Sequence, residues 1–195
     1  IMADTRFPHL FRPLTIRGVT LKNRIMSTGH DTTLPTDGTV NDALVAYHRA
    51  RAKGGAGLIV TQVAGVHETA RYTSHLLMAT GDECIPGYRR LAEACHAEGC
   101  VVFSQLFHPG REIMESADGL LAVAYAPSVT PNERFRVMPR ALSAAMIDEM
   151  TTMQMRIVDV IASTCSAWTR CSGPNCHDAT DWPRASIPEA IVVTR

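Results

Sequence analysis

Three short apolar runs, separated by two helical patterns, dominate the first half of the chain. The runs are rich in Val and Ile and predict strands at residues 23–28, 57–65 and 100–108. Between them, the spacing of apolar side chains predicts helices over residues 41–53 and 86–99, each closed by glycine. The order strand, helix, strand, helix, strand is typical of an α/β fold with parallel strands.

The segments around these runs carry weaker patterns. Residues 14–21 predict a hairpin that turns at Arg17-Gly18, an element able to plug the bottom of a barrel. Residues 144–158 predict a helix with a methionine stripe, which usually packs in a core. The span 109–139 is predicted to be a long loop after the third strand, and such loops are often functional. After residue 159 the pattern is lost.

Composition narrows the class of protein. With 195 residues and 46% hydrophobic side chains, the chain suits one domain that buries a core. Its formal net charge is zero, so no general field attracts nucleic acid or an anionic membrane. No apolar run approaches the roughly 20 residues of a membrane helix, and the start lacks a signal-peptide core. We therefore expect a soluble cytoplasmic protein.

The six cysteines are expected to be reduced in that compartment. Cys95 and Cys100 fall at positions where a small buried hydrophobic residue fits. Residues 171–177 come nearest to a metal pattern, but their spacing fits neither usual zinc pairing, so no metal is predicted. No phosphate-binding glycine loop, hydrolase motif or other catalytic signature was found, and the catalytic residues stay unknown.

Polar and small residues gather where each predicted strand ends. In parallel α/β folds, ligands bind outside the carboxyl ends of the strands. The amide of Gln105 can donate and accept at once, as the edge of a heterocyclic ring demands, but a core amide satisfied by backbone groups explains it equally well. Surface or loop-anchoring roles are open for His30, His108 and Arg111. Their clustering at strand ends favours a ligand site.

Three ordered motifs resemble a known family. They are LFRPLTIRGVTLKNRI at residues 10–25, VAYHRARAKGGAGLIV at 45–60 and QLFHPGR at 105–111. They are similar to motifs of the old yellow enzyme family of NADH:flavin oxidoreductases, in the branch of 2,4-dienoyl-CoA reductase and trimethylamine dehydrogenase. The resemblance runs from about residue 7 to residue 159.

The resemblance implies an FMN-binding (β/α)8 barrel, a TIM barrel, of which this chain holds the first three or so units. In such enzymes NADH or NADPH reduces the flavin, which passes a hydride to an activated alkene or related small-molecule acceptor. The implied flavin ring lies beside the end of the first strand, next to Val63 of the second, with its pyrimidine edge on Gln105. Gln62 stands where many members have Glu. The implied cofactor-binding residues are Thr28, Gly29, His30, Val63, Gln105 and, at the rim, Arg111.

The chain also departs from the family, because residues 160–195 show no likeness to it, in contrast to residues 1–159. The substrate-anchoring histidine pair and the flavin phosphate site are not recognisable, and His177 does not match that pair. A (β/α)8 barrel needs roughly 250 residues, and an unclosed one leaves strand edges unpaired. An inactive truncated or frameshifted fragment is therefore the alternative to an enzyme. Another barrel enzyme ranks last, and the oligomeric state, a homo-oligomer included, stays open.

Overall fold

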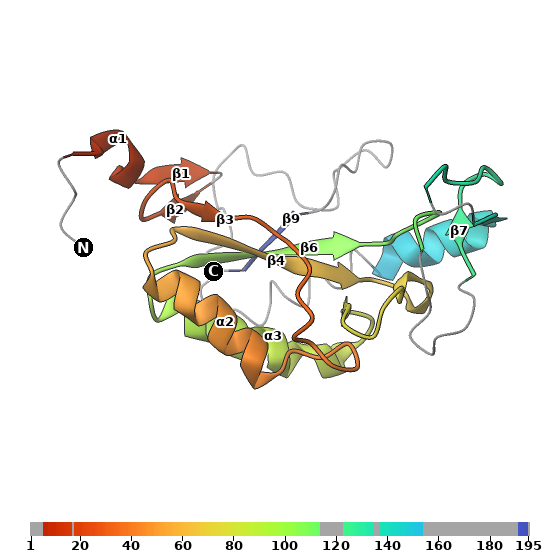
Figure 1. Cartoon of the computed structure of the whole chain (residues 1–195), viewed down its shortest axis with the longest axis horizontal. Helices are drawn as coiled ribbons and strands as arrows, with labels where there is room; N and C mark the ends of the chain where they lie inside the picture. Colours follow the sequence, from red (N-terminus) through yellow and green to blue (C-terminus); the bar gives the residue numbers. More distant parts are fainter. Residues whose placement is uncertain (1–5, 17, 114–122, 135–136, 154–190, 195) are drawn as a thin grey trace.

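The computed structural model describes residues 6–16, 18–113, 123–134, 137–153 and 191–194. Its centre is a mixed five-stranded sheet (Figure 1). The strand order is β3-β4-β6-β9, and β5 pairs with β4 away from this path. The strands are β3 (Met26–Ser27), β4 (Leu58–Gly65), β5 (Leu77–Met78), β6 (Val101–Phe107) and β9 (Ile191–Thr194).

The three predicted strands pair in parallel, as expected for an α/β fold. β3 and β6 lie on the two sides of β4, and both run parallel to it. β3 is shorter than predicted because the chain before it turns. The Asn23 side chain accepts a hydrogen bond from Ile25 N at 3.0 Å and donates one to Gly55 O at 2.8 Å. This turn keeps residues 23–25 out of the sheet.

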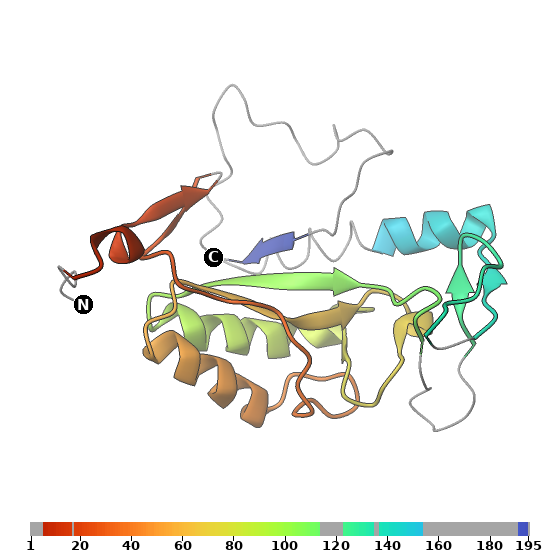
Figure 2. The same ribbon diagram turned by 45° about the horizontal axis from the view of Figure 1, so that its top comes forward.

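Two helices cover one face of the sheet (Figure 2). They are α2 (Asp42–Lys53) and α3 (Ile85–His96), which agree with the predicted helices to within a few residues. Asn41 caps α2 by accepting a hydrogen bond at 3.0 Å from the third backbone N–H beyond it. Gly55 follows α2 with a φ of +110°, a conformation that glycine adopts without strain.

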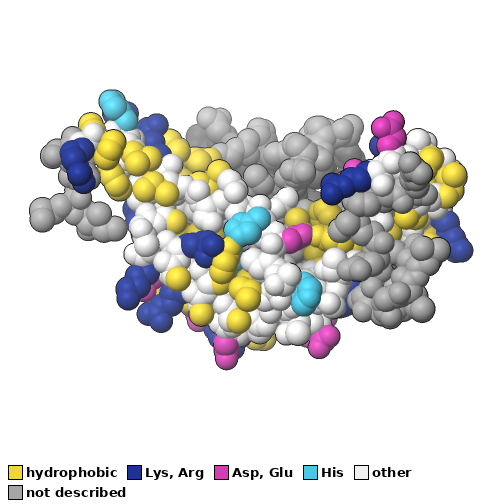
Figure 3. Space-filling view, in the orientation of Figure 1, with side chains coloured by type: hydrophobic (Ala, Val, Ile, Leu, Met, Phe, Trp, Pro, Cys, Tyr) yellow, Lys and Arg dark blue, Asp and Glu magenta, His cyan; other side chains and the backbone are white. Residues whose placement is uncertain are grey.

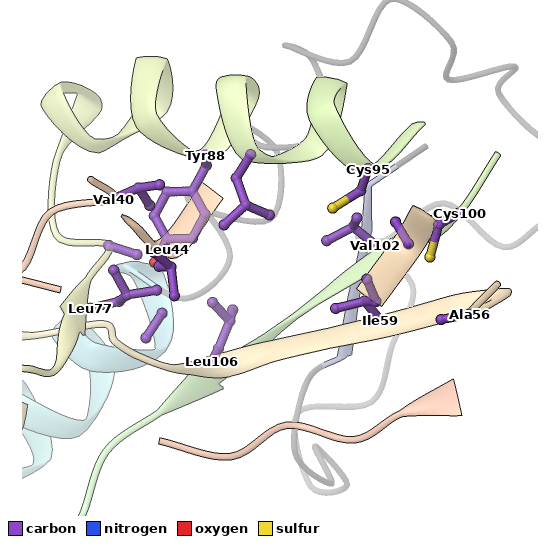
Figure 4. Packing of buried hydrophobic residues seen from close by; sticks show 14 of the residues in the cluster. Val40, Leu44, Ala56, Ile59, Leu77, Tyr88, Cys95, Cys100, Val102 and Leu106 are labelled. Atoms are coloured by element: carbon purple, nitrogen blue, oxygen red, sulfur yellow. The ribbon is translucent and has the colours of Figure 1, made fainter. Parts of the chain in front are cut away.

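The main core lies between these helices and the sheet (Figure 4). Leu44 of α2 packs with Ile59 and Leu106 of the sheet in one buried cluster. Cys95 and Cys100 are buried in the same cluster as free thiols, which confirms their predicted role as small hydrophobic residues. Burial raises the pKa of Cys95 to about 12, so this thiol stays protonated at neutral pH.

The predicted hairpin is confirmed and closes the amino ends of the strands. It consists of β1 (Leu14–Ile16) and β2 (Val19–Leu21), which pair antiparallel around Gly18. Beyond this hairpin, hydrophobic side chains remain exposed around the short helix α1 (Pro8–Phe11), as Figure 3 shows. The hairpin packs against the face of the sheet opposite α2 and α3, which we call the open face. The contact is a second hydrophobic cluster of Leu21, Leu58, Val101 and Phe103, with Leu14, Val19 and Val60 around them.

Several short elements were not predicted. The expected loop over residues 109–139 contains β7 (Tyr125–Ala126), which pairs in parallel with β8 (Arg140–Ala141). Two-residue strands have no periodicity that a sequence pattern can reveal. The 3₁₀ turns η1 (Glu68–Ala70) and η2 (Asp82–Cys84) were missed for the same reason.

The strand β9 lies in the tail that the sequence pattern did not place. Its residues 191–194 pair antiparallel with β6, from Val102 opposite Thr194 to Gln105 opposite Ile191. The run Ile-Val-Val-Thr is rich in β-branched residues, which favour a strand. An unclosed barrel is expected to leave strand edges unpaired, whereas the outer edge of β6 is covered over these four residues.

The third predicted helix is described over residues 144–153, and residues 154–158 lie outside the described part. Met146, Met150 and Met153 are half-buried on this otherwise largely exposed helix, so the stripe faces inward without reaching a core. The proposed boundary near residue 159 and the cysteines and His177 beyond it also lie outside the described residues. None of the helices in the described ranges has the length and apolar character that a membrane crossing requires.

Candidate active site

The face of the sheet opposite α2 and α3 presents a polar group near the carboxyl ends of its strands. Side chains two residues apart share a face, so Phe103, Gln105 and Phe107 of β6 point to the same side. Val63 of β4 pairs with Gln105 in register, and both are half-buried. The register between β4 and β6 shifts between Val60 and Val63, which is how Val63 comes to stand beside the amide.

Gly29 brings the loop after β3 against Gln105 and the backbone of β4. A Cβ placed on Gly29 would lie 2.7 Å from Gln105 Oε1 and 2.9 Å from the Thr61 carbonyl oxygen. Only a residue without a side chain fits this approach without displacing its neighbours. The structure therefore gathers Gly29, Val63 and Gln105, which come from three different strand ends.

A glutamine at a strand end can be a core amide bonded within the protein or an amide left for a ligand, and the structure contains one of each. Gln62 is a core amide, 1% exposed. Its Oε1 accepts hydrogen bonds from Thr32 Oγ1 at 2.6 Å and Thr32 N at 3.3 Å, and its Nε2 donates to His75 O at 3.0 Å. Gln105 is half-buried, and its amide has no hydrogen-bond partner among the described residues. Gln105 is thus available to a ligand, and Gln62 is not.

The remaining predicted residues are directed elsewhere. Thr28 is exposed directly after β3. One ring nitrogen of His30 is 3.1 Å from the Thr28 carbonyl oxygen, and the other bonds the hydroxyl of Tyr47 on α2. Arg111 is exposed after β6 and donates from Nη1 to Pro131 O at 3.3 Å. None of these contacts joins Thr28, His30 or Arg111 to Gln105, and their roles stay predictions.

A further contact at the strand ends was not predicted. The hydroxyl of Tyr72, in the segment after η1, donates to the carboxylate of Asp31 in the loop after β3. The Tyr72 ring lies edge-on to Phe107, with 5.7 Å between ring centroids. Burial and the Asp31 carboxylate raise the pKa of Tyr72, so its proton stays on the phenol. Tyr72 falls in a segment without periodicity, so no sequence signal marks it.

His108, at the end of the QLFHPGR motif, anchors loops. Its Nδ1 accepts a hydrogen bond from Gly110 N at 3.1 Å, and its Nε2 is 2.9 Å from Thr69 Oγ1. Burial, and to a lesser extent the nearby His67, lowers the pKa of His108 to about 4. The ring is therefore neutral at physiological pH, and both nitrogens are engaged within the protein.

Parallel strands with an apolar plug at their amino ends and polar groups at their carboxyl ends are arranged as in the first units of a (β/α)8 barrel. Comparison with known proteins supplies the family. The sequence profile of the NADH:flavin oxidoreductase / NADH oxidase family matches residues 9–167. The chain belongs to this family, whose members use FMN with NADH or NADPH as the reductant.

Characterised relatives are much longer than this chain. A metal reductase of Desulforamulus reducens is 34% identical over 161 residues, which are 83% of this chain and 22% of the relative. The NADH oxidase of Thermoanaerobacter brockii is 34% identical over 149 residues, or 75% of this chain and 23% of the relative. The NADPH dehydrogenase of Bacillus subtilis is 32% identical over 146 residues, which cover 72% of this chain and 40% of the relative. The chain thus spans less than half the length of these relatives.

Solved structures agree with this assignment. A 2-naphthoyl-CoA reductase superposes with a TM-score of 0.68 at 26% identity, over 79% of this chain and 25% of the reductase. Morphinone reductase gives a TM-score of 0.67 at 25% identity, over 77% of this chain and 44% of the reductase. The predicted fold class, an α/β chain that forms the first part of a TIM barrel, is confirmed.

The residues around Gln105 fit the ring of a flavin. The unpartnered amide of Gln105 offers both a donor and an acceptor to a pyrimidine edge. Val63 supplies a half-exposed apolar surface beside it, and the lack of a side chain on Gly29 leaves room for the Gln105 amide. No cationic side chain takes part in this group of three residues.

Proposed function

We propose that this chain is the amino-terminal part of an FMN-dependent oxidoreductase that passes hydride from NADH or NADPH to an activated alkene or related acceptor. The unpartnered, half-exposed amide of Gln105 carries this proposal. A bound flavin supplies the hydride chemistry. Family membership supports the reaction type, whereas the acceptor and a cytoplasmic location stay predictions.

The chain's own residues would orient the flavin ring. Gln105 would bond the pyrimidine edge, Val63 would contact the ring, and Gly29 would lie beside the ring, where its missing side chain leaves room for the Gln105 amide. Thr28, His30 and Arg111 would border the ring and the loop above it. Gln105, Val63 and Gly29 carry no charge, so they would hold the ring edge without binding a phosphate group.

An inactive fragment is the second candidate, and one observation favours it. β9 occupies the outer edge of β6 in an antiparallel direction. In a (β/α)8 barrel that edge pairs with the next parallel strand, so β9 blocks closure there. We propose that residues 160–195 do not continue the barrel of residues 1–159.

Titration of the purified chain with FMN and with riboflavin tests both candidates. Because the site holds the ring but no phosphate, we expect the two flavins to bind with dissociation constants within about twofold of each other. The Gln105→Glu variant keeps the shape of the side chain and loses its hydrogen-bond donor. It should therefore weaken the binding of FMN and of riboflavin by about tenfold. Fluorescence quenching of the flavin measures each constant.

The outcomes separate the candidates. Flavin binding followed by bleaching on addition of NADH or NADPH supports an active oxidoreductase. Flavin binding without bleaching, or no binding, identifies an inactive fragment. Binding that Gln105→Glu leaves unchanged contradicts the placement of the ring on Gln105, and FMN binding far tighter than riboflavin contradicts a ring-only site.

A further inference from the structure

A chain of hydrogen bonds runs along the carboxyl-end rim beside the proposed flavin contacts. It starts at His108 after β6, passes through Thr69 of η1 and reaches His67 directly after β4. His67 Nε2 then lies 3.8 Å from Glu149 Oε1 on the helix of residues 144–153. Loops that are 39 residues apart in the sequence thus meet at one hydroxyl group.

The donors and acceptors of this chain have one consistent direction. Gly110 N–H can only donate, so Nδ1 of His108 is an acceptor, and the ring proton of neutral His108 sits on Nε2. That Nε2–H donates to Thr69 Oγ1 at 2.9 Å, which leaves the Thr69 hydroxyl free to donate to His67 Nδ1 at 2.7 Å. Thr69 N also donates to this nitrogen, at 3.2 Å. The proton of neutral His67 therefore sits on Nε2, facing Glu149.

Thr69 occupies the centre of this arrangement because a hydroxyl can accept and donate at the same time. Valine has the same shape but can do neither, and serine can do both. His67 lies four residues after Val63, and His108 lies three residues after Gln105. The two strand ends that carry the proposed ring contacts are therefore the ones joined through Thr69.

We propose that Thr69 is a positioning residue: its hydroxyl joins the rings of His67 and His108, whose Nε2–H tautomers the N–H groups of Thr69 and Gly110 fix, and so ties the ends of β4 and β6 into one rim. The low pKa of His108, about 4, agrees with this arrangement because a protonated ring would lose the bond from Gly110 N–H. Only the effect on flavin binding rests on the function proposed above.

Nitrogen NMR of the histidine side chains and hydrogen exchange of the backbone amides test this role in the full chain without any ligand. In the wild-type protein, His67 and His108 should both show the Nε2–H tautomer. Thr69→Val should keep both tautomers, because the backbone N–H groups of residue 69 and Gly110 still donate to the two Nδ1 atoms. It should speed amide exchange around His67 and His108 about fivefold, the effect of losing one hydrogen bond. Thr69→Ser should restore the wild-type exchange. Glu149→Gln should speed exchange in the helix and leave the His108 tautomer unchanged.

Two results would overturn the proposal. One is a wild-type Nδ1–H tautomer at His108, which is measurable even if Thr69→Val does not fold. The other is a Thr69→Val protein whose amide exchange around His67 and His108 matches the wild type. Riboflavin affinity is measured separately, where Thr69→Val should weaken binding about fivefold and Thr69→Ser should not. If wild-type chain binds no flavin, the proposed function fails while the NMR and exchange results still decide the role of Thr69.

Discussion

The two ends of the sheet's open face are built from the same strands but serve different purposes. At the amino ends, Phe103 of β6 is 7% exposed beneath the hairpin, together with Leu58 and Val101. At the carboxyl ends, Gln105 and Phe107 of the same strand are half-buried. These β6 side chains all point to the same face, so the strand itself does not explain why Phe103 is buried and Gln105 is not. The hairpin does, because it covers the amino ends of the strands and leaves the carboxyl ends open.

Two glutamines show the same contrast at the level of single side chains. Gln62 is covered, and its amide bonds two loops, at Thr32 and at His75. Gln105 is open, and its amide bonds nothing among the described residues. The residue type is identical, so the surroundings decide which amide serves stability and which is left for a ligand.

The largest expected effect comes from removing a covered aromatic side chain. Phe103→Ala should lower the free energy of unfolding by about 3–5 kcal/mol, because it opens a cavity between the hairpin and the sheet. Phe107→Ala should cost only about 1 kcal/mol, since that ring is half-exposed and contacts Tyr72 edge-on. Urea denaturation of the two variants measures both values. Equal losses would show that the two ends of the face do not differ as described.

The sequence predicted that the amino ends of the strands are covered and that the carboxyl ends carry polar residues, but not the contacts that these polar residues make. Apolar runs and glycine stops were sufficient to place β4, β6, α2 and α3, because these elements follow regular periods. The hairpin was predicted from its turn, and its packing on the strands then followed from its apolar side chains. Local pattern therefore predicts the covered end well.

The open end was harder to predict because its contacts are not local. Sequence could not separate Gln62 from Gln105, since the partners of Gln62 come from loops 30 and 13 residues away. The shift of register before Val63 also breaks the simple alternation of β4, so the side that Val63 faces was given by resemblance and not by period. The bond from Tyr72 to Asp31 has no sequence signal at all.

Covered polar groups should also make stability depend on pH. His48 on α2 is 3% exposed, and neither ring nitrogen has a partner among the described residues. Burial, then Arg51 and His30, lower its pKa from 6.5 to about 4. Between these pH values the unfolded chain binds a proton that the folded chain excludes, so stability falls as pH falls through this window and levels off below about 4. The expected loss is about 3 kcal/mol.

Denaturation curves of His48→Leu across this pH range check the prediction. The variant should lose about 3 kcal/mol less than the wild type between pH 6.5 and pH 4, because no proton uptake at this position then favours the unfolded chain. His9→Ala, which changes an exposed histidine of α1, is the control and should leave the wild-type profile unchanged. Parallel profiles for His48→Leu and wild type would contradict a neutral, buried His48.

The smallest effects on stability sharpen the comparison of the two glutamines. Gln62→Leu should lower the free energy of unfolding by about 2 kcal/mol, because the Thr32 hydroxyl and the His75 carbonyl lose their buried partner. Gln105→Leu should change it by no more than about 0.5 kcal/mol, since no hydrogen bond within the described chain is lost. Thermal and urea denaturation of both variants, without added flavin, measure the difference.

Gln62→Glu separates the two hydrogen-bonding functions of the covered amide. A carboxylate still accepts from Thr32 Oγ1 and Thr32 N, but it places an acceptor against the His75 carbonyl oxygen, where Nε2 now donates at 3.0 Å. The variant should therefore be less stable than the wild type at neutral pH and should recover part of the loss in acid, where the protonated acid can donate again. Gln105→Glu, whose side chain meets no such carbonyl, should show no comparable recovery. If Gln62→Glu were as stable as the wild type at neutral pH, the bond to His75 would contribute nothing, and the contrast between the two amides would rest on Thr32 alone.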